Sequence, residues 1–504
     1  MIQIQNVTLT LNQSLRTLVA GLTVSLGDGD KAAVIGEEGN GKSTLLKAVC
    51  DPSLIAGYAS MQGAVRLGGH LPGYVAQEMP ADLLNRPVSS LFAGFHPSDG
   101  AEAAAEVGLH SNILTSERPI RTFSGGEKVK LQIARLLLSG ADFLLLDEPT
   151  NDLDIETLEW LERFIVRFDG PILYISHDET LLERTANLIL HIEQIRKKTV
   201  PRCSVIRAGY ADYIARRTAA LSHQEQMARK EQADFDRRTQ RWDEIFRQVE
   251  KAQRTVARAD PGSGRLLKKK MHTVQSQKRR FEREKEQMTP MPDVEDAIFL
   301  AFSETISLPA GKRVLDESIP TLSAGGRVLA ENVQLHLSGG EHIAIVGRNG
   351  AGKTTLLRSI AQSLCARPDL HAAYMPQHYA ERFDLSETPV DFLAPSGRKD
   401  DVTRVRSFLG NAKFTRDEMC GPIGALSGGQ RAKLFFLKMV LDESDVLLLD
   451  EPTRNLSPLS APVVRGILRD FRGSILCVTH DRKLLDEVFD TVYELTPLGL
   501  RQIR

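Results

Sequence analysis

Two glycine-rich segments of this 504-residue chain combine the residue types that bind phosphate. The first runs from Gly36 to Thr44 and the second from Gly347 to Thr355, each after an apolar run. Glycines let backbone N–H groups close around phosphate oxygens, the lysine adds a cation, and the hydroxyl after it can hold Mg²⁺. The candidate phosphate-binding residues are Gly36, Gly39, Gly41, Lys42, Ser43 and Thr44, and Gly347, Gly350, Gly352, Lys353, Thr354 and Thr355.

The same landmarks follow each segment in the same order. They are a glutamine at a strand end, a Ser-Gly-Gly helix start, an apolar strand ending in Asp-Glu-Pro-Thr, and a strand ending in His-Asp. Their key residues are Gln77, Ser124, Gly125, Gly126, Asp147, Glu148 and His177, then Gln377, Ser427, Gly428, Gly429, Asp450, Glu451 and His480. The serine-to-aspartate interval is 23 residues in both copies and the aspartate-to-histidine interval is 30, which indicates an internal duplication.

These landmarks resemble the P-loop, Q-loop, signature, Walker B and switch histidine of the ATP-binding cassette superfamily. The resemblance covers both halves of the chain. It implies an α/β fold with two P-loop cassette domains, ATP and Mg²⁺ as cofactors, and hydrolysis of ATP to ADP and phosphate. Two accidental glycine-rich turns would not reproduce both the order and the spacing.

The chemistry assigns the same roles in each cassette. A strand-end aspartate and the P-loop hydroxyl hold Mg²⁺, the next glutamate orients and polarises the attacking water, the histidine contacts the γ-phosphate region, and the glutamine senses metal and water. The assigned residues are Asp147, Ser43, Glu148, His177 and Gln77 in the first cassette, and Asp450, Thr354, Glu451, His480 and Gln377 in the second.

In this superfamily the signature serine of one cassette caps the γ-phosphate bound by the other cassette. The composite sites implied by the resemblance are Lys42 with Ser427, Gly428 and Gly429, and Lys353 with Ser124, Gly125 and Gly126. Because one chain carries both cassettes, the pairing is expected to be intramolecular and to need no second subunit.

The two copies differ close to the expected phosphates. Glu37 and Glu38 put negative charge beside the first P-loop, where the second has Arg348, which predicts weaker nucleotide affinity at the first. After Asp-Glu-Pro-Thr the first copy carries Asp154, whereas the second has Ser457 at the matching position. The two nucleotide sites are therefore expected to be inequivalent. The strands before the P-loops contain no aromatic residue to stack on adenine, so base selectivity is not assigned.

Composition favours a protein of the cytoplasm. Hydrophobic residues make up 42% of the chain, enough for a large core in each of two or three domains. No apolar run approaches the roughly 18 residues that indicate a membrane span. Met1 leads directly into an alternating strand, which is not the pattern of a signal peptide. The five cysteines show no metal or disulfide spacing, as is typical of a reducing compartment.

A basic segment separates the cassettes. Residues 214–290 contain 20 Lys or Arg and 11 Asp or Glu, a net charge of +9 in a chain of formal net charge −1. Two heptad stripes predict antiparallel helices that form a coiled coil, the first over 217–258, with a turn at 260–264. The stripe residues are Leu221, Ala228, Phe235, Trp242, Val249 and Val256, then Leu267, Val274, Phe281 and Met288. The predicted domains are 1–213, 214–292 and 293–504.

Positive charge gathers toward the predicted tip of this hairpin. The basic residues there are Lys251, Arg254, Arg258, Arg265, Lys268, Lys269, Lys270, Lys278, Arg279 and Arg280. One interpretation is an inert strut whose charges only keep it soluble. The concentration of charge at one end favours RNA phosphates instead, where each neutralised contact gains from counterion release.

Two cassettes in one chain joined by a basic helical linker resemble the ABC-F family of ribosome-associated ATPases. The resemblance implies that the linker enters the tRNA exit site, contacts rRNA and the P-site tRNA, and points toward the peptidyl-transferase centre. Residues 451–460 and 308–315 resemble the branch that protects ribosomes from lincosamides, streptogramin A and pleuromutilins. Two alternatives stay open: a housekeeping factor that rescues stalled ribosomes, and an ATPase subunit that docks on a separate membrane transporter.

Overall fold

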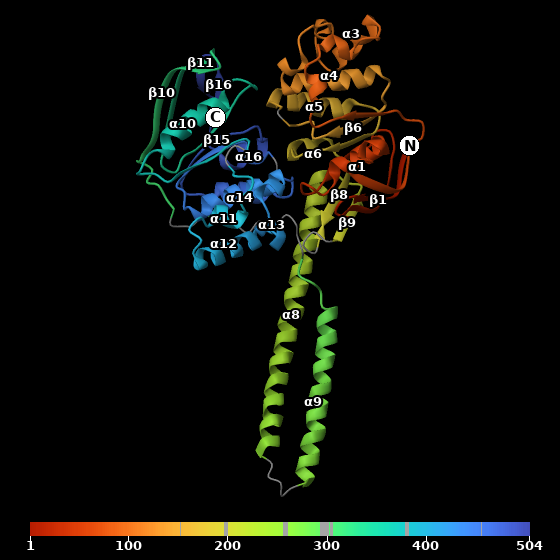
Figure 1. The fold of residues 1–504 in the computed structure, drawn as a ribbon, viewed down its shortest axis with the longest axis vertical. Helices are drawn as coiled ribbons and strands as arrows, with labels where there is room; N and C mark the ends of the chain where they lie inside the picture. The colour runs from red at the N-terminus through yellow and green to blue at the C-terminus, as the bar shows by residue number, and fades with distance from the viewer. Residues whose placement is uncertain are drawn as a thin grey trace. The chain divides into compact units, whose positions relative to one another are not determined.

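The computed structural model describes residues 1–151, 153–195, 200–255, 261–292, 302, 306–378, 383–454 and 456–504. The chain forms two compact units, one comprising Met1–Tyr210 with Glu295–Arg504, the other Ala211–Val294 (Figure 1). The first unit contains both cassettes.

The first cassette is built on two sheets. A three-stranded antiparallel sheet has the order β2-β1-β4, and a six-stranded sheet has the order β5-β6-β7-β3-β8-β9. All neighbours in the larger sheet are parallel except β8 and β9. The strands are β1 (Ile2–Leu11), β2 (Thr17–Leu26), β3 (Lys31–Ile35), β4 (Ala59–Arg66), β5 (Pro72–Val75), β6 (Phe143–Asp147), β7 (Ile172–Ile175), β8 (Leu188–Gln194) and β9 (Val200–Ile206).

The second cassette repeats this topology. Its six-stranded sheet has the order β13-β14-β15-β12-β16-β17, which matches the first sheet strand for strand, beside a two-stranded antiparallel sheet. The strands are β10 (Arg313–Ala324), β11 (Arg327–Ser338), β12 (His342–Val346), β13 (Ala372–Met375), β14 (Val446–Asp450), β15 (Ser474–Val478), β16 (Thr491–Thr496) and β17 (Gly499–Gln502). The predicted α/β class and the duplication are confirmed.

Helices flank the sheets in both cassettes. The first cassette has α1 (Lys42–Cys50), α2 (Ala81–Leu84), α3 (Pro97–Glu106), α4 (Gly125–Leu138), α5 (Ile155–Arg167) and α6 (Glu179–Thr185). The second has α10 (Lys353–Cys365), α11 (Pro389–Leu393), α12 (Lys399–Asn411), α13 (Arg416–Cys420), α14 (Gly428–Leu441), α15 (Ala461–Arg469) and α16 (Arg482–Val488).

The central strands carry the site residues at their carboxyl ends. Strands β3, β6, β7 and β14 are buried along their whole length, as expected for continuous apolar runs covered on both faces of a parallel sheet. The turn after β3 needs glycine at Gly36, whose φ is 144° and where a Cβ would lie 2.2 Å from the carbonyl oxygen of Ile192. The sheet therefore positions each P-loop, and each P-loop leads directly into α1 or α10.

The second unit contains two long helices, α8 (Tyr210–Thr255) and α9 (Pro261–Gln287), which lie side by side (Figure 1). The predicted turn at 260–264 is wrong in part, because α9 already begins at Pro261. Proline fits the first position of a helix, where its missing N–H would have no partner anyway. Residues 256–260, with Val256 and Arg258, lie outside the described residues.

The heptad stripes form the seam between α8 and α9. Phe235 and Val274 are buried, and the Phe235 ring meets Phe281 edge to face with centroids 6.0 Å apart. The Trp242 indole N–H donates to the carbonyl of Val274 at 2.8 Å. Within the described ranges, no helix combines the length and apolarity needed to cross a membrane.

Candidate functional site

Each P-loop lysine folds back over its own loop. Lys42 Nζ donates to the carbonyl oxygens of Gly36 at 2.9 Å and Glu37 at 3.1 Å. Lys353 Nζ makes the matching contacts with the two residues that follow β12, at 2.7 and 3.0 Å. Both lysines are buried. The ammonium groups therefore lie inside the loops whose N–H groups would face phosphate.

The expected Mg²⁺ ligands of the first cassette are in contact. Ser43 Oγ donates to Asp147 Oδ1 at 2.9 Å. Sequence reasoning missed Tyr74, whose hydroxyl donates to Asp147 Oδ2 at 2.7 Å from the neighbouring strand β5. Its place in β5, three residues before Gln77, was the only available signal.

In the second cassette, Thr354 Oγ1 donates to Asp450 Oδ1 at 3.3 Å. Asp450 is fully buried, and its Oδ2 atom has no hydrogen-bond partner among the described residues. A buried carboxylate oxygen without a donor, beside a hydroxyl, is a set of hard oxygen ligands that fits Mg²⁺. The described residues contain no cluster of three or more His, Cys, Asp or Glu that could form a protein-only metal cage.

Glu148 is surrounded by hydrogen-bond donors. Gln77 Nε2 lies 2.9 Å and Asn151 Nδ2 lies 2.8 Å from its Oε2, while His177 Nε2 lies 3.0 Å from Oε1. Burial opposes ionisation of this carboxyl, but His177, Lys42 and Asn151 outweigh burial and lower its pKa to about 2. Glu148 is therefore a carboxylate tied into a network that includes the predicted glutamine and histidine.

Glu451 has a different environment. The backbone N–H of His480 donates to its Oε2 at 3.3 Å, and His480 Nε2 lies 3.8 Å from Oε1. Burial and the neighbouring Asp450 raise the pKa of Glu451 to about 8, although Lys353 opposes this. Burial and Lys353 lower the pKa of His480 to about 3. The pKa values of the two corresponding glutamates are thus shifted in opposite directions.

The site of Lys353 (the Lys353 site) borders a cavity of about 640 Å³. Gly125 and Lys128 of the first cassette reach this cavity from α4, opposite the second P-loop. The signature serine Ser124 caps α4 through a capping box with Glu127. From the second cassette, the lining includes Gly350, Gly352, Lys353, Thr354, Thr355, Gln377, Asp450, Glu451 and His480. One signature segment and the opposite P-loop therefore face the same cavity.

The site of Lys42 (the Lys42 site) is built from the reciprocal segments, which contact one another directly. Glu38 Oε2 accepts the backbone N–H of Gly429, in the first turn of α14, at 2.5 Å. Ser427, which caps α14, lines a cavity of about 20 Å³ together with Glu37 and Glu38. The acidic pair of the first P-loop thus contacts the second signature segment.

Comparison with known proteins agrees with this geometry. The family model described as ABC transporter matches residues 19–151 and 330–454, half of the chain. The chain belongs to the ABC transporter family. It is 29% identical to the ATP-binding protein Uup of Escherichia coli (strain K12) over 93% of this chain and 76% of that protein. It is 27% identical to ABC transporter F family member 5 of Arabidopsis thaliana, over 83% and 56% respectively, so its relatives are of the ABC-F type.

A solved structure shares the fold of this ABC protein. The archaeal ribosome recycling factor aABCE1, solved with the archaeal ribosomal stalk protein aP1, aligns with a TM-score of 0.60 at 19% identity. The alignment covers 99% of this chain and 90% of that chain.

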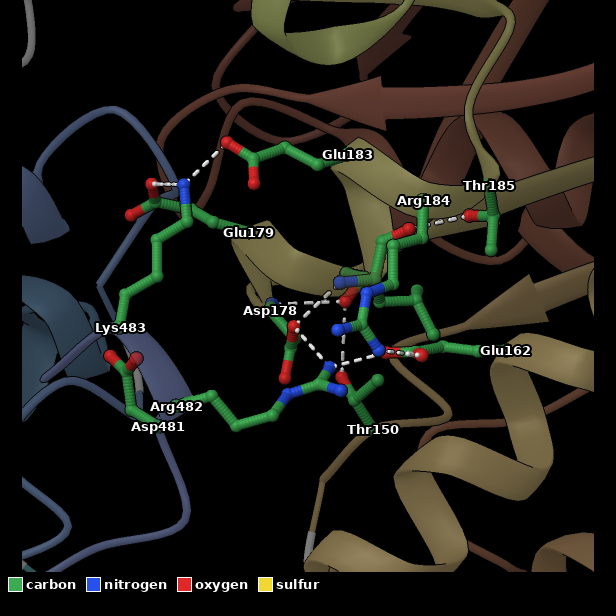
Figure 2. Close-up of polar contacts among 12 residues, drawn as sticks. Thr150, Glu162, Asp178, Glu179, Glu183, Arg184, Thr185, Asp481, Arg482 and Lys483 are labelled. Carbon is green, nitrogen blue, oxygen red and sulfur yellow. Dashed lines mark hydrogen bonds and ion pairs between the residues drawn. The ribbon is translucent and has the colours of Figure 1, made fainter. Parts of the chain in front are cut away.

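Ion pairs join the two ABC cassettes beside the nucleotide sites (Figure 2). The Arg482 guanidinium lies 2.5 Å from Glu162 and 3.0 Å from Asp178. Lys483 Nζ lies 3.3 Å from Glu179 and also contacts Glu183. All the bases in these contacts come from the second cassette and all the acids from the first.

The predicted RNA-binding residues lie in the helical unit. Arg265, Lys268, Lys269 and Lys270 are exposed in the first half of α9. Arg280 is exposed but pairs with Glu284 at 2.9 Å. Lys251 is exposed near the end of α8. The remaining predicted residues, Arg254, Arg258, Lys278 and Arg279, have side chains outside the described part of the chain.

Proposed function

We propose that this chain is an ABC-F ATPase that binds the ribosome at the tRNA exit site and remodels the peptidyl-transferase region, thereby protecting ribosomes from antibiotics. The observation that supports ATP-driven closure most directly is the Lys353 cavity, which a P-loop of one cassette shares with the signature segment of the other. A nucleotide there would touch both cassettes, so its binding and loss would change how tightly they pair.

Hydrolysis follows from the residues around each P-loop. The P-loop amides and lysine hold the phosphates, while Ser43 and Asp147, or Thr354 and Asp450, would hold Mg²⁺. The metal ion supplies charge neutralisation for the β- and γ-phosphate oxygens. Glu148 or Glu451 orients a water whose oxygen bonds to the γ-phosphorus as the bond to the β,γ-bridging oxygen breaks.

The helical unit supports a ribosomal partner. The exposed residues Arg265, Lys268, Lys269 and Lys270 form a basic surface on one half of α9, and Leu266 beside them is 73% exposed. Cations suit rRNA phosphates, and an exposed apolar side chain suits a base or a drug pocket. A solved relative in fold, aABCE1, is described as a ribosome recycling factor, which favours the same class of partner for this chain.

Ribosome co-sedimentation tests the proposal. The double variant Glu148→Gln, Glu451→Gln retains the phosphate-binding groups but loses both water-orienting carboxylates. It is therefore expected to trap ATP and to pellet with ribosomes in ATP but not in ADP, whereas the wild type releases. Equal pelleting of wild type and variant in both nucleotides contradicts an ATP-controlled ribosome cycle.

Drug susceptibility tests the finer part of the proposal. A sensitive bacterium that expresses the chain is expected to tolerate a lincosamide, streptogramin A or a pleuromutilin better than the same strain with an empty vector. Removal of residues 260–270 is expected to abolish this tolerance, while some ribosome binding through the cassettes remains. Ribosome binding without any change in susceptibility identifies the chain as a housekeeping translation factor instead.

A further inference from the structure

The internal duplication pairs four residues that surround the two nucleotide sites. Glu37 lies five residues before Lys42, as Arg348 does before Lys353. Ser457 lies seven residues after the Walker B aspartate, as Asp154 does in the first cassette. We call the segment that follows Asp-Glu-Pro-Thr the D-loop. The second P-loop carries a base, Arg348, and the opposite D-loop carries Asp154, whereas the first P-loop carries an acid and the opposite D-loop carries a serine.

Glu37 is held by three side chains of the second cassette. Its Oε1 accepts hydrogen bonds from the hydroxyls of Ser457 at 2.7 Å and Ser460 at 2.5 Å. Lys433 Nζ, on α14, lies 3.5 Å from its Oε2. Glu37, Lys433, Ser457 and Ser460 are all buried. A buried carboxylate with two hydroxyl donors and a lysine is a satisfied anion in contact with both the D-loop and the signature helix of the opposite cassette.

The Lys353 site has its extra carboxylate on the other side of the interface. Asp154 caps α5 by accepting from the N–H of Thr157 at 3.0 Å. The charge of Asp154 raises the pKa values of Lys353 and His480, opposing the larger lowering caused by burial of each group. Asn151 and Leu153, which precede Asp154 in the same loop, line the Lys353 cavity, so this loop borders the second nucleotide site. At the Lys42 site, burial opposes ionisation of Glu37, but Lys433, Ser460, Ser457 and Lys42 together lower its pKa to about 2.

We propose that Glu37 is a positioning residue of the Lys42 site, supplying from the P-loop the carboxylate that the opposite D-loop lacks at Ser457. Each nucleotide site then has one such carboxylate at the cassette interface. It comes from the D-loop of the opposite cassette at the Lys353 site and from the P-loop itself at the Lys42 site. The inference rests on the proposed ATP hydrolysis but not on the ribosomal partner.

The relocation has two opposite consequences for the Lys42 site. The carboxylate holds the D-loop and signature helix in place, which favours turnover. It also lies near Lys42 and repels nucleotide phosphates, which weakens binding. Loss of the Glu37 charge should therefore tighten ATP binding and slow hydrolysis at the same time. Simple loss of folding stability would not produce this combination.

Relocation of the carboxylate tests the proposal in the full-length chain. Glu37→Gln removes the charge, Ser457→Asp places a second carboxylate against Glu37, and the double variant moves the carboxylate to the D-loop. Glu156→Gln is the matched control, because it removes an interface carboxylate whose side chain is 75% exposed. The measurements are kcat and KM for ATP, thermal unfolding, and the affinity for a fluorescent ATP analogue in a Lys353→Ala background.

We expect Glu37→Gln to bind the analogue at least about threefold more tightly and to lower kcat at least about threefold, on the scale of one partly screened charge. Ser457→Asp should lower both affinity and kcat, because two carboxylates would meet in a buried space. The double variant should recover kcat to within about twofold of wild type, and Glu37→Asp should recover part of it. Glu156→Gln should change neither quantity.

Two results overturn the inference: unchanged affinity and kcat in Glu37→Gln, or a double variant no better than Ser457→Asp. If Ser457→Asp fails to fold, the opposite changes in affinity and kcat of Glu37→Gln still decide. If the wild type does not hydrolyse ATP, the proposed function fails while the analogue affinity of Glu37→Gln still tests the role of the charge. No ribosome is present, so these results are independent of the ribosomal partner.

Discussion

The two candidate water-orienting glutamates share a strained backbone but not an environment. Glu148 and Glu451 have φ values of 48° and 53°, in the left-handed region that residues with a Cβ rarely adopt. Glu148 accepts hydrogen bonds from two amide side chains, whereas Glu451 receives one backbone N–H and faces the larger cavity. The two glutamates, although they occupy duplicated positions, therefore differ in their hydrogen-bond donors and in their access to a cavity.

Single substitutions at these glutamates are expected to have unequal effects. Glu451→Gln should lower the ATPase rate by about 10²-fold, the usual contribution of a general base. Glu148→Gln should cost less than about tenfold, because Glu38 already occupies the N–H of Gly429 in the signature segment that faces the Lys42 site. Steady-state ATPase assays of the two purified variants measure this difference. Indistinguishable rates would remove the prediction.

At the scale of elements, the same pair of duplicated positions meets twice across the cassette interface. Glu162 on α5 pairs with Arg482 on α16 at 2.5 Å, and Arg465 on α15 pairs with Glu179 on α6 at 2.6 Å. In both contacts the first cassette supplies the acid and the second supplies the base. Two copies of the first cassette paired in this geometry would place Glu162 against Glu179, and like charges disfavour that arrangement. The charges therefore select pairing between unlike cassettes.

Arg465 is expected to stabilise the paired cassettes. Both members of the Arg465–Glu179 pair are buried, and Arg465 donates to both carboxylate oxygens of Glu179. Its removal leaves this buried carboxylate with Lys483, 3.3 Å away, as its remaining cation. Arg465→Met should lower the free energy of unfolding by about 3–5 kcal/mol and loosen the coupling between the cassettes. Differential scanning calorimetry measures both effects: the lost stability lowers the midpoint temperature, and the looser coupling broadens the transition.

Arg469→Ala provides the control on the same helix. Among the described residues, Arg469 forms an ion pair with its neighbour Asp470, and both side chains are more than half exposed. The thermal transition of this control should stay close to that of wild type, since exposed pairs contribute about 0–1 kcal/mol. A transition for Arg465→Met that matches the control would show that the buried pair does not hold the cassettes together.

At the scale of the whole molecule, a near-neutral chain carries its excess positive charge in one helical unit. The unit has a net charge of +9 between residues 214 and 290, against −1 for the full chain. Phe235 and Val274 are buried in the seam between α8 and α9, whereas Arg265, Lys268, Lys269 and Lys270 of α9 are exposed. Positive charge concentrated in one unit favours a polyanionic partner. We therefore expect the helical unit, and not the cassettes alone, to select that partner.

Replacement of Lys268, Lys269 and Lys270 by alanine should weaken ribosome binding and flatten its salt dependence. Each lost phosphate contact lowers the log–log slope by up to about one unit. The ATPase rate of the free protein should stay unchanged, because these residues belong to the helical unit. Co-sedimentation at a series of KCl concentrations measures the slope.

An equal charge removed elsewhere on the hairpin provides the matched control. Lys230, Arg241 and Arg247 are exposed on α8. Their triple alanine variant should change the slope less, because the proposed contact lies on α9. If both triple variants behave alike, only net charge matters; if neither changes binding, the hairpin is an inert strut.

Local spacing in the sequence determined the two cassettes, the P-loop residues, the strand-end acids and the hairpin seam. These features depend on residues close in the chain, where a glycine pattern or a heptad repeat is set by neighbours. Local sequence did not distinguish a turn from a helix start at Pro261, because proline suits both a turn and the first position of a helix.

The tertiary structure alone decided which of these residues meet. Ser457 and Glu37 are 420 positions apart, and no spacing rule relates them, although each departs from its duplicated partner. The opposite charges at matching positions likewise became an interface only when the cassettes packed together. Contacts between distant segments depend on how two folded surfaces fit, and burial makes their hydrogen bonds and charges strong enough to distinguish two sites of nearly the same sequence.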